Sequence, residues 1–592
     1  MLLLVALALA EFPLPTYPEC GEPDRPELCP SDMANRWNFL SYIPAAWGVT
    51  LDATEEEGMG PGMWLDRAFR VTTGRTDVVI AVIDSGVHWD DGDVVRKFVL
   101  NARELPPPEG SDVHDRNGDG AVTVADYDGD PRVDITAGDD AADHLLDPSD
   151  LIATFSDGID DDANGYVDDI CGWDFQWDDN NPYDDVRFGH GTGESEDAAA
   201  EGNDGGDIGT CPNCVVLPVR VGDSFVVDGS TFGSGLVFSI DSGADVALVA
   251  AGAVQQTATV EAAVDYAWDM GTLVIGSAAD ETAYHPNPPG MAAHTFYVHA
   301  IVYNEDDPED SSSFLAYSNC TNHGVRLDGS ASSTSCSSGA TGVTSGLTGL
   351  VISAARDAGW EPTPGELHAL LGMNADDIAL PDDPARYPTK PGWDAWSGWG
   401  RVNAYNSVLA ASLAQVPPVA EISEPQWYDW IDPLVTPSIT VSGLVQSRGE
   451  VQTWVLSYGL GLEPTEWTVV ASGTGPIDGP LADFELPAFD VTVVDQPKGS
   501  NPVDRELNAN VGTVQLRLSV TDDEDRVTTA RTSFYVVHDP DAVSGWPIEL
   551  PHSLESSPAL ADLDGDGASE VIQADSGGWI HALRAAGTAL PG

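Results

Sequence analysis

The first part of the chain contains short, continuous runs of apolar residues that predict buried strands. Because these runs do not alternate with polar residues, we expect both faces of each strand to be covered, as in a parallel sheet between helices. The clearest runs are residues 78–83, 215–219, 246–249 and 272–275.

Helical patterns lie between and after these runs. Val260, Val264 and Trp268 recur at helical spacing between the last two runs. The sequence Thr363-Pro-Gly-Glu366 has the form of a capping box with proline at the first helical position, which predicts a helix start. Strands that alternate with helices predict an α/β domain with a parallel sheet, which we place at residues 58–415.

The pattern changes after a proline-containing joint near residue 416. Later segments alternate apolar and polar residues between turns, which predicts an antiparallel β-sandwich of immunoglobulin or fibronectin type over residues 416–541. The remaining residues, 542–592, contain an Asp-Leu-Asp-Gly-Asp-Gly sequence and resemble one FG-GAP repeat of a β-propeller. A single blade cannot bury its own faces, so we expect this sequence to be a fragment of a longer protein.

The N-terminus predicts export. Residues 1–10 form an apolar run that ends in Ala-Leu-Ala, as in a secretory signal peptide, although no basic residue precedes it. A buried strand is the alternative for this run. Residues 11–57 then form an N-terminal extension, and no later apolar run approaches the roughly 20 residues that cross a bilayer. We therefore expect a secreted, extracellular protein without a membrane span.

The charge of the chain excludes one class of partner. The sequence has 97 acidic and 24 basic residues, for a net charge of -73. Such a surface repels phosphate backbones, so we expect no nucleic-acid partner. The charge indicates either bound divalent cations or an acidic, solvated surface.

The seven cysteines are compatible with disulfides in an exported protein. A zinc site is the alternative for the Cys-Pro-Asn-Cys sequence at 211–214, but no second pair of cysteines or histidines follows at a suitable spacing. The sequence does not fix the connectivity. Proximity favours the pairs Cys20 with Cys29, Cys211 with Cys214 and Cys320 with Cys336, which leaves Cys171 over.

Three residues are candidates for the groups that activate a serine hydroxyl. This chemistry needs a neutral imidazole as base, held in one tautomer by a carboxylate. Asp84 ends the first buried run, His190 lies in Gly-His-Gly-Thr, and Ser338 lies in a stretch of small residues. With these motifs in the order Asp, His, Ser, the chain resembles the subtilisin-like serine peptidases, the subtilase family.

The resemblance implies an α/β catalytic domain that cleaves protein and peptide substrates as a serine endopeptidase. It implies Asp84, His190 and Ser338 as the catalytic residues. A shifted register, with Thr341 as nucleophile and Gly349 aligned, is the alternative. The motifs after His190 and around Ser338 depart from the family pattern. A catalytically weak or inactive subtilase that serves as an extracellular adhesion or scaffold protein, with a partner bound through its C-terminal β modules, therefore stays open.

Two further positions are assigned through the resemblance. Asp280 stands where the family has an asparagine that donates to the oxyanion. A protonated carboxyl group there could donate, whereas an ionised one would repel the oxyanion, so we expect activity to be favoured at mildly acidic pH. The segment Ala250, Ala251 and Gly252 stands where the family pairs with an extended substrate backbone.

The insertion between the aspartate and the histidine, residues 101–185, is rich in acidic residues and predicts bound Ca²⁺. A first loop has oxygen-bearing side chains at positions 1, 3, 5, 9 and 12 of an EF-hand-like or dockerin-type pattern, and a second loop repeats the acidic alternation. Calcium would order the insertion and protect the fold from self-digestion, whereas a disordered acidic loop is the alternative. The predicted ligands are Asp115, Asn117, Asp119, Thr123 and Asp126 in the first loop, Asp157, Asp160, Asp162, Asn164 and Asp168 in the second, and, in the last repeat, Asp562, Asp564 and Asp566.

Overall fold

The structure is a computed structural model of the chain. The predicted signal peptide, residues 1–10, lies outside the described residues. In the part of the chain that is described, no helix combines the length and the apolar character needed to cross a membrane. The described part is residues 12–590 with gaps at 23–24, 34–35, 43–61, 140–144, 204, 254, 303–319, 380–388, 428, 492–510, 541, 549, 553 and 555.

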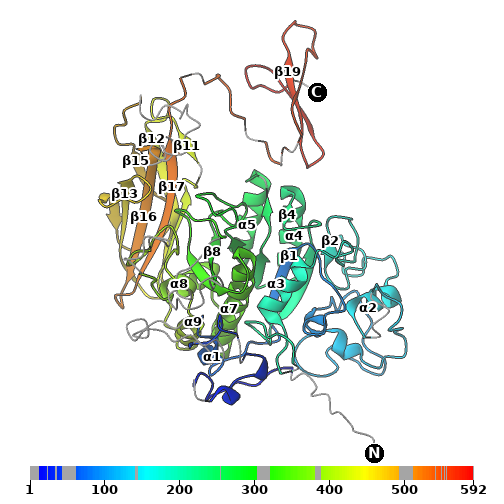
Figure 1. Cartoon of the computed structure of the whole chain (residues 1–592). Helices are drawn as coiled ribbons and strands as arrows, with labels where there is room; N and C mark the ends of the chain where they lie inside the picture. The colour runs from blue at the N-terminus through cyan, green and yellow to red at the C-terminus, as the bar shows by residue number, and fades with distance from the viewer. Residues whose placement is uncertain are drawn as a thin grey trace, which may run out of the picture.

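A seven-stranded parallel sheet forms the centre of the α/β domain (Figure 1). In spatial order its strands are β2 (Trp173–Asp174), β3 (Val215–Arg220), β1 (Val79–Asp84), β5 (Val246–Val249), β7 (Leu273–Ser277), β8 (Thr295–Val302) and β9 (Gly329–Ser333). The four apolar runs of the sequence are β1, β3, β5 and β7. Their residues are almost all buried, so the predicted coverage of both faces is confirmed.

Helices cover the two faces of this sheet. Ile80 and Val82 of β1 pack in one core with residues of α7, whereas Ala81 and Ile83 pack in a second core with α4 and α5. The predicted helix through Val264 and the predicted capping box are confirmed in α5 and α8. The helices are α1 (Leu65–Ala68), α2 (Pro148–Phe155), α3 (His190–Ala199), α4 (Gly229–Asp241), α5 (Ala258–Met270), α7 (Ser337–Asp357), α8 (Pro364–Met373) and α9 (Ala404–Ser412), with short 3-10 helices η1 (Pro26–Leu28), η2 (Ser31–Met33), η4 (Val95–Lys97) and η5 (Val124–Tyr127).

The N-terminal extension packs into the α/β domain. Leu14 and Phe39 are buried in the same core as β1 and α7. The backbone N–H of Leu14 donates to Asn213 Oδ1 at 2.6 Å, and Asn213 Nδ2 donates back to the Leu14 carbonyl at 2.9 Å. The acidic insertion adds to this core in the same way, through buried residues such as Tyr127 and Leu151. Both segments are therefore integral parts of the folded domain.

The cysteine pairing predicted from proximity is confirmed. Disulfides join Cys20 to Cys29, Cys211 to Cys214 and Cys320 to Cys336, and Cys171 is a buried free thiol.

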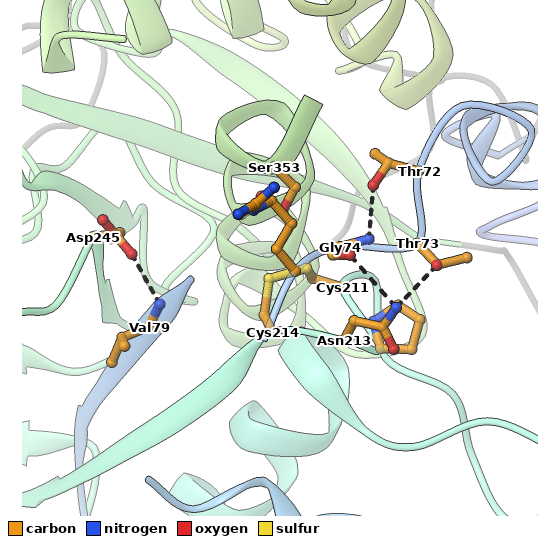
Figure 2. Close-up of a disulfide and its surroundings, with 12 residues drawn as sticks. Thr72, Thr73, Gly74, Val79, Cys211, Asn213, Cys214, Asp245 and Ser353 are labelled. Atoms are coloured by element: carbon orange, nitrogen blue, oxygen red, sulfur yellow. Dashed lines mark hydrogen bonds between the residues drawn. A yellow bond between two sulfur atoms is a disulfide. The ribbon is translucent and has the colours of Figure 1, made fainter. Parts of the chain in front are cut away.

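The Cys211–Cys214 disulfide lies between the loop at Gly74 and helix α7 (Figure 2). A Cβ atom at Gly74 would lie 2.4 Å from the Cys211 sulfur, and one at Gly349 would lie 2.7 Å from the Cys214 sulfur. Glycine at these two positions therefore lets the disulfide contact both segments closely. Because both sulfurs are used in the disulfide, they are not available as zinc ligands.

A β-sandwich follows the α/β domain (Figure 1). Its two sheets have the orders β10-β12-β15 and β11-β17-β16-β13-β14, and their pairings are antiparallel except for β11 with β17. A separate three-stranded antiparallel sheet, β18-β19-β20, completes the described chain, and its assignment as an FG-GAP repeat stays a prediction. The strands are β10 (Val419–Glu424), β11 (Trp430–Ile431), β12 (Ser438–Gln446), β13 (Val451–Leu460), β14 (Thr468–Gly473), β15 (Ile477–Glu485), β16 (Thr513–Asp522), β17 (Val527–Val536), β18 (Ala559–Ala561), β19 (Glu570–Ala574) and β20 (Ile580–Leu583).

Trp427 joins the sandwich to the α/β domain. It follows β10 and is 1% exposed. Its side chain packs in a small core with Tyr297 and Leu327 of the α/β domain. A Cβ atom at Gly324 would lie 2.4 Å from the indole ring, so the ring rests directly on the backbone of that domain.

Replacement of Trp427 by alanine is expected to lower the free energy of unfolding by about 3–5 kcal/mol, because it removes a buried aromatic ring and leaves a cavity. Denaturant unfolding of the purified variant measures this loss. Trp430→Ala is the control, because Trp430 is 46% exposed and a surface substitution changes stability by about 0.5 kcal/mol or less. Equal effects of the two substitutions would contradict the assigned role of Trp427.

Candidate active site

The structure brings Asp84, His190 and Ser338 into one hydrogen-bonded series. His190 Nδ1 lies 2.8 Å from Asp84 Oδ1 and 2.9 Å from Oδ2, and His190 Nε2 lies 3.0 Å from Ser338 Oγ. Asp84 is the last residue of β1, His190 is the first residue of α3, and Ser338 is in the first turn of α7. The three side chains therefore meet at the carboxyl end of the parallel sheet, where sites form in α/β folds.

Glycines around His190 allow this approach. Gly189 precedes the helix with a φ of 81°, a conformation that favours glycine. A Cβ atom at Gly191 would lie 2.3 Å from the Gly86 carbonyl oxygen. The start of α3 therefore packs directly on the loop after β1, and the imidazole reaches the carboxylate of Asp84.

The environment of His190 favours its protonated form. Burial alone would lower the pKa of the imidazole, but the charge of Asp84 and the hydrogen bond to it outweigh burial and raise the pKa to about 9. Asp84 itself is fully buried, and its Oδ1 also accepts from the Ser85 N–H. When the Nδ1–H of His190 donates its hydrogen bond to Asp84, Nε2 faces the hydroxyl of Ser338 with its lone pair.

Thr341 does not occupy the position of the nucleophile. Its hydroxyl donates to the Ser337 carbonyl of the preceding turn at 2.9 Å and is buried inside α7. Gly349, which the alternative register aligns, instead packs against the Cys214 sulfur. The geometry therefore favours Ser338 over Thr341 as the hydroxyl next to His190.

Asp280 lies at the N-terminus of α7, next to Ser338. Its Oδ1 accepts from the Ser337 N–H at 2.9 Å and from the Ser337 hydroxyl at 2.6 Å. The N-cap residue of α7, Cys336, makes no side-chain capping bond, so Asp280 fulfils this role from outside the helix. Its observed contacts are thus those of an acceptor, whereas the sequence led us to expect a donor.

The family follows from comparison of the sequence with known proteins. Residues 75–400, more than half of the chain, match the model of the subtilase family. The chain belongs to the subtilase family. It is a serine peptidase of this family.

Two curated relatives are similar to this subtilase. Thermitase from Thermoactinomyces vulgaris is 30% identical over 255 residues, which cover 40% of this chain and 81% of thermitase. The thermophilic serine proteinase of Bacillus sp. (strain AK1) is 35% identical over 146 residues, 23% of this chain and 35% of that protein. Among solved structures, Sphericase has a TM-score of 0.37 and 16% identity, and the match covers 56% of this chain and 92% of Sphericase.

The predicted substrate-binding segment of the subtilase lies next to the site but is mostly buried. Ala250 and Ala251 are 5% and 0% exposed, and Gly252 is partly exposed. Gly252 and Ala253 form the short strand β6, which pairs in parallel with β4 (Val226–Val227). A Cβ atom at Gly252 would lie 2.3 Å from Asn287 Oδ1, so a larger residue does not fit. Substrate binding by this segment stays a prediction.

Two exposed phenylalanines beside His190 were not predicted. The ring of Phe225 lies 5.6 Å from the imidazole, that of Phe188 lies 6.0 Å from it, and the two phenyl rings are 5.7 Å apart. Their exposures are 50% and 44%, so the site has an apolar, accessible wall. Sequence spacing gave no signal for this wall, because the two residues lie in separate loops.

The acidic insertion gathers a different set of carboxylates from the predicted one. Ligand oxygens of Glu104, Asp162 and Asp169 lie within 4.8 Å of one another. Of these, only Asp162 was predicted. Asp168 turns away with a φ of 57°, and its carboxylate accepts from the N–H groups of residues 157 and 158.

The cluster of Glu104, Asp162 and Asp169 is suited to a hard cation. Glu104 is 4% exposed, and its Oε2 has no hydrogen-bond partner among the described residues. Burial raises the pKa of Asp169 to about 7, despite hydrogen bonds from Asn164 and Asn101. Buried carboxyl oxygens with unsatisfied lone pairs are ligands that Ca²⁺ prefers.

The other predicted calcium loops share one backbone pattern. In the first loop, Asp115 accepts from the N–H groups of Gly118 and Gly120, and in the last repeat Asp562 accepts from those of Gly565 and Gly567. Among the described residues, the carboxylates of Asp562, Asp564 and Asp566 converge as a second acidic cluster, which lies on the surface. Within the same part of the chain, those of Asp115, Asp119 and Asp126 form no such cluster, and calcium binding there stays a prediction.

The titration of His190 is expected to have a midpoint near pH 9, well above its ordinary value of 6.5. NMR of the ring nitrogens in a Ser338→Ala variant measures it. Because the folded state holds the proton more tightly, the stabilisation is complete below about pH 6.5 and is lost as the pH rises through 9. Asp84→Asn is expected to bring the midpoint down, because burial then acts without its counter-charge. A midpoint near 6.5 in the Ser338→Ala variant would contradict this account.

Proposed function

We propose that the chain is a secreted serine endopeptidase in which Ser338 is the nucleophile, His190 the general base and Asp84 the residue that orients the imidazole. The observation that carries this proposal is the pair of contacts on one imidazole, to Asp84 at 2.8 Å and to Ser338 at 3.0 Å. In the first step, Ser338 Oγ attacks the scissile carbonyl and its proton passes to His190 Nε2. The imidazolium is stabilised by the charge of Asp84.

The remaining steps complete acylation and then hydrolyse the acyl-enzyme. His190 gives its proton to the leaving amine, the C–N bond breaks, and an acyl-enzyme remains on Ser338. A water molecule then enters, loses a proton to His190 and attacks the ester carbon. Collapse of the second tetrahedral intermediate returns the proton to Ser338 and releases the carboxylic acid.

The N-terminus of α7 supports stabilisation of the oxyanion. Ser338 lies in the first turn of this helix, where backbone N–H groups have no intrahelical acceptor and the helix dipole favours negative charge. Asp280 accepts hydrogen bonds at this end, so we do not assign it as the second donor. A missing side-chain donor slows turnover about 10²- to 10³-fold. Because the charge of Asp84 outweighs burial and raises the pKa of His190 to about 9, we propose that protonation of this imidazole limits activity on the acid side and that the optimum is alkaline.

The surroundings of the site support an extended peptide as substrate. Phe188 and Phe225 offer an exposed apolar wall beside His190, which favours an apolar substrate side chain at this place. The three disulfides support secretion, because such bonds persist in oxidising surroundings.

A fluorophosphonate probe is expected to label Ser338 covalently in the wild-type protein. Ser338→Ala abolishes labelling, and Asp84→Asn slows it about 10⁴-fold, because the imidazole loses the group that fixes its tautomer. Time courses of labelling, followed by mass spectrometry of the labelled peptide, measure both effects.

Thr341→Val is the matched control for these labelling experiments. Its hydroxyl lies one turn along the same helix but bonds only within α7 in the described structure, so labelling is expected to continue. A wild-type protein that does not label would support the alternative of an inactive subtilase acting as a scaffold. Labelling that survives Ser338→Ala and disappears with Thr341→Val would instead identify Thr341 as the nucleophile.

We also propose that Ca²⁺ binds in the insertion, with Glu104, Asp162 and Asp169 as ligands. The support is the convergence of their oxygens and the unpaired Oε2 of Glu104. A bound divalent cation would remove the repulsion among three buried carboxylates. When bound, calcium supplies a structural charge far from the reacting atoms, and no step of hydrolysis passes through it.

Calcium is expected to raise the thermal midpoint of the wild-type protein, and a chelator to lower it. At a calcium concentration about 100 times Kd the folded state gains about 2.7 kcal/mol. Glu104→Gln is expected to need at least about tenfold more calcium for the same midpoint, because it loses a charged ligand. Glu109→Gln, an exposed position in the same insertion, is the control. Equal calcium responses of the two variants in differential scanning fluorimetry would exclude the cluster as the site.

A further inference from the structure

A second acidic residue, Glu194, lies one helical turn below the contact between His190 and Ser338. His190 and Glu194 are four residues apart on α3, and Ser338 and Gly342 are four residues apart on α7, so each pair shares one helix face. At the N-terminal ends of the two helices, a hydrogen bond joins Ser338 and His190. One turn further along both helices, a Cβ atom on Gly342 would lie 2.8 Å from Glu194 Oε2. The absence of a side chain at Gly342 thus makes room for the carboxyl group.

One oxygen of the Glu194 carboxyl group is buried without a hydrogen-bond partner among the described residues. The residue is 4% exposed, and its Oε2 has no hydrogen-bond partner in the part of the chain that is described. Asp197, on the same side of α3, differs because Arg36 lies 3.4 Å from its Oδ1. A buried carboxyl oxygen without a partner costs free energy, so its presence at this place calls for a cause.

The charged groups that act on Glu194 through space are three carboxylates and one imidazole. The carboxylates are Asp84 at the end of β1, Asp197 on α3 and Asp280 after β7, and the imidazole is His190. On the α7 side, Glu194 faces Gly342. Among these groups, only His190 can give Glu194 a positive neighbour.

We propose that Glu194 is a positioning residue that sets, through its charge, the pH at which His190 becomes a general base. The proposal rests on the role of His190 in the proposed function. Glu194 is distinct from Asp84, because it forms no hydrogen bond to the imidazole and acts on it through the space between α3 and α7.

The direction of the effect follows from electrostatics. Burial raises the pKa of Glu194 well above its usual value, and the imidazole opposes this shift. For His190, burial lowers the pKa, while Asp84, then Glu194 and Asp280, raise it. The two groups therefore compete for protons, and an ionised Glu194 favours the imidazolium. In the pH range where Glu194 is ionised, its charge suppresses the free base and stabilises the imidazolium that forms during the attack by Ser338.

Glu194→Gln tests the proposal, because it removes the charge and keeps the size of the side chain. The acid limb of the kcat/KM profile on a peptide substrate is expected to move down by about one pH unit, which makes the variant up to about tenfold faster than wild type on that limb. Above the limb, kcat is expected to fall, because the imidazolium loses a stabilising charge. Glu196→Gln is the matched control, since Glu196 is on the same helix but faces Asp91 and is not among the groups that act on His190.

A direct titration separates this inference from the proposed function. NMR of His190 in Ser338→Ala, with and without Glu194→Gln, reports the midpoint of the imidazole without any need for activity, and Glu194→Met replaces Gln if that variant does not fold. A downward shift of about one unit, absent in Glu196→Gln, supports the role of Glu194. An unchanged midpoint overturns it, even when the wild-type enzyme reacts with the fluorophosphonate probe. A wild-type protein that does not react overturns the proposed function instead.

Discussion

The close approach of helices α3 and α7 is the constraint on which the site depends. The hydrogen bond between Ser338 and His190 requires the first turns of two helices to meet, so the rest of α3 and α7 must pack with their backbones in close contact. At Gly346, a Cβ atom would lie 2.5 Å from the Ala198 carbonyl oxygen. Glycine inside a helix costs about 1 kcal/mol relative to alanine. The glycines of α7 are therefore a stability cost that the contact with α3 requires.

This close packing also determines the electrostatics of the enzyme. At Gly339 and Gly342 of α7, carboxyl groups of α3 occupy the space that a side chain would fill, and acidic groups surround a single imidazole. The same excess of acid is found throughout the chain, in which 97 acidic residues face 24 basic ones. Many of these carboxylates are used as local acceptors: Asp147 caps α2, Asp228 caps α4, and Asp280 serves the start of α7. The fold thus accommodates its charge largely through backbone N–H groups.

The sequence predicted the sheet, and it singled out three residues that the structure brings into contact, because both are local signals. A buried strand is a continuous apolar run, and Asp84, His190 and Ser338 each lie in a short motif. The carboxylate cluster was predicted poorly, because Glu104 reaches it from a segment 58 residues before Asp162. The alternation of the second loop suggested Asp168, but a left-handed backbone at that residue leaves Asp169 in the cluster.

The same limit applies to side chains whose role depends on what faces them. Asp280 was correctly placed beside the site, but its partners are N–H and O–H groups of Ser337, which no spacing reveals. Glu194 was visible only as a departure from a family motif. Its environment depends on Gly342, which lies 148 residues further along the chain. The sequence alone provides residue types, but it does not show which distant segments pair in space.

The packing of the N-terminal extension makes the protease domain depend on this segment. Leu14 is held by two hydrogen bonds to Asn213, and Phe39 lies in the main core. Removal of this stretch would expose the apolar core residues that pack against it beside the sheet. The extension is therefore a load-carrying part of the hydrophobic core of the protease domain, and the domain needs it to stay closed.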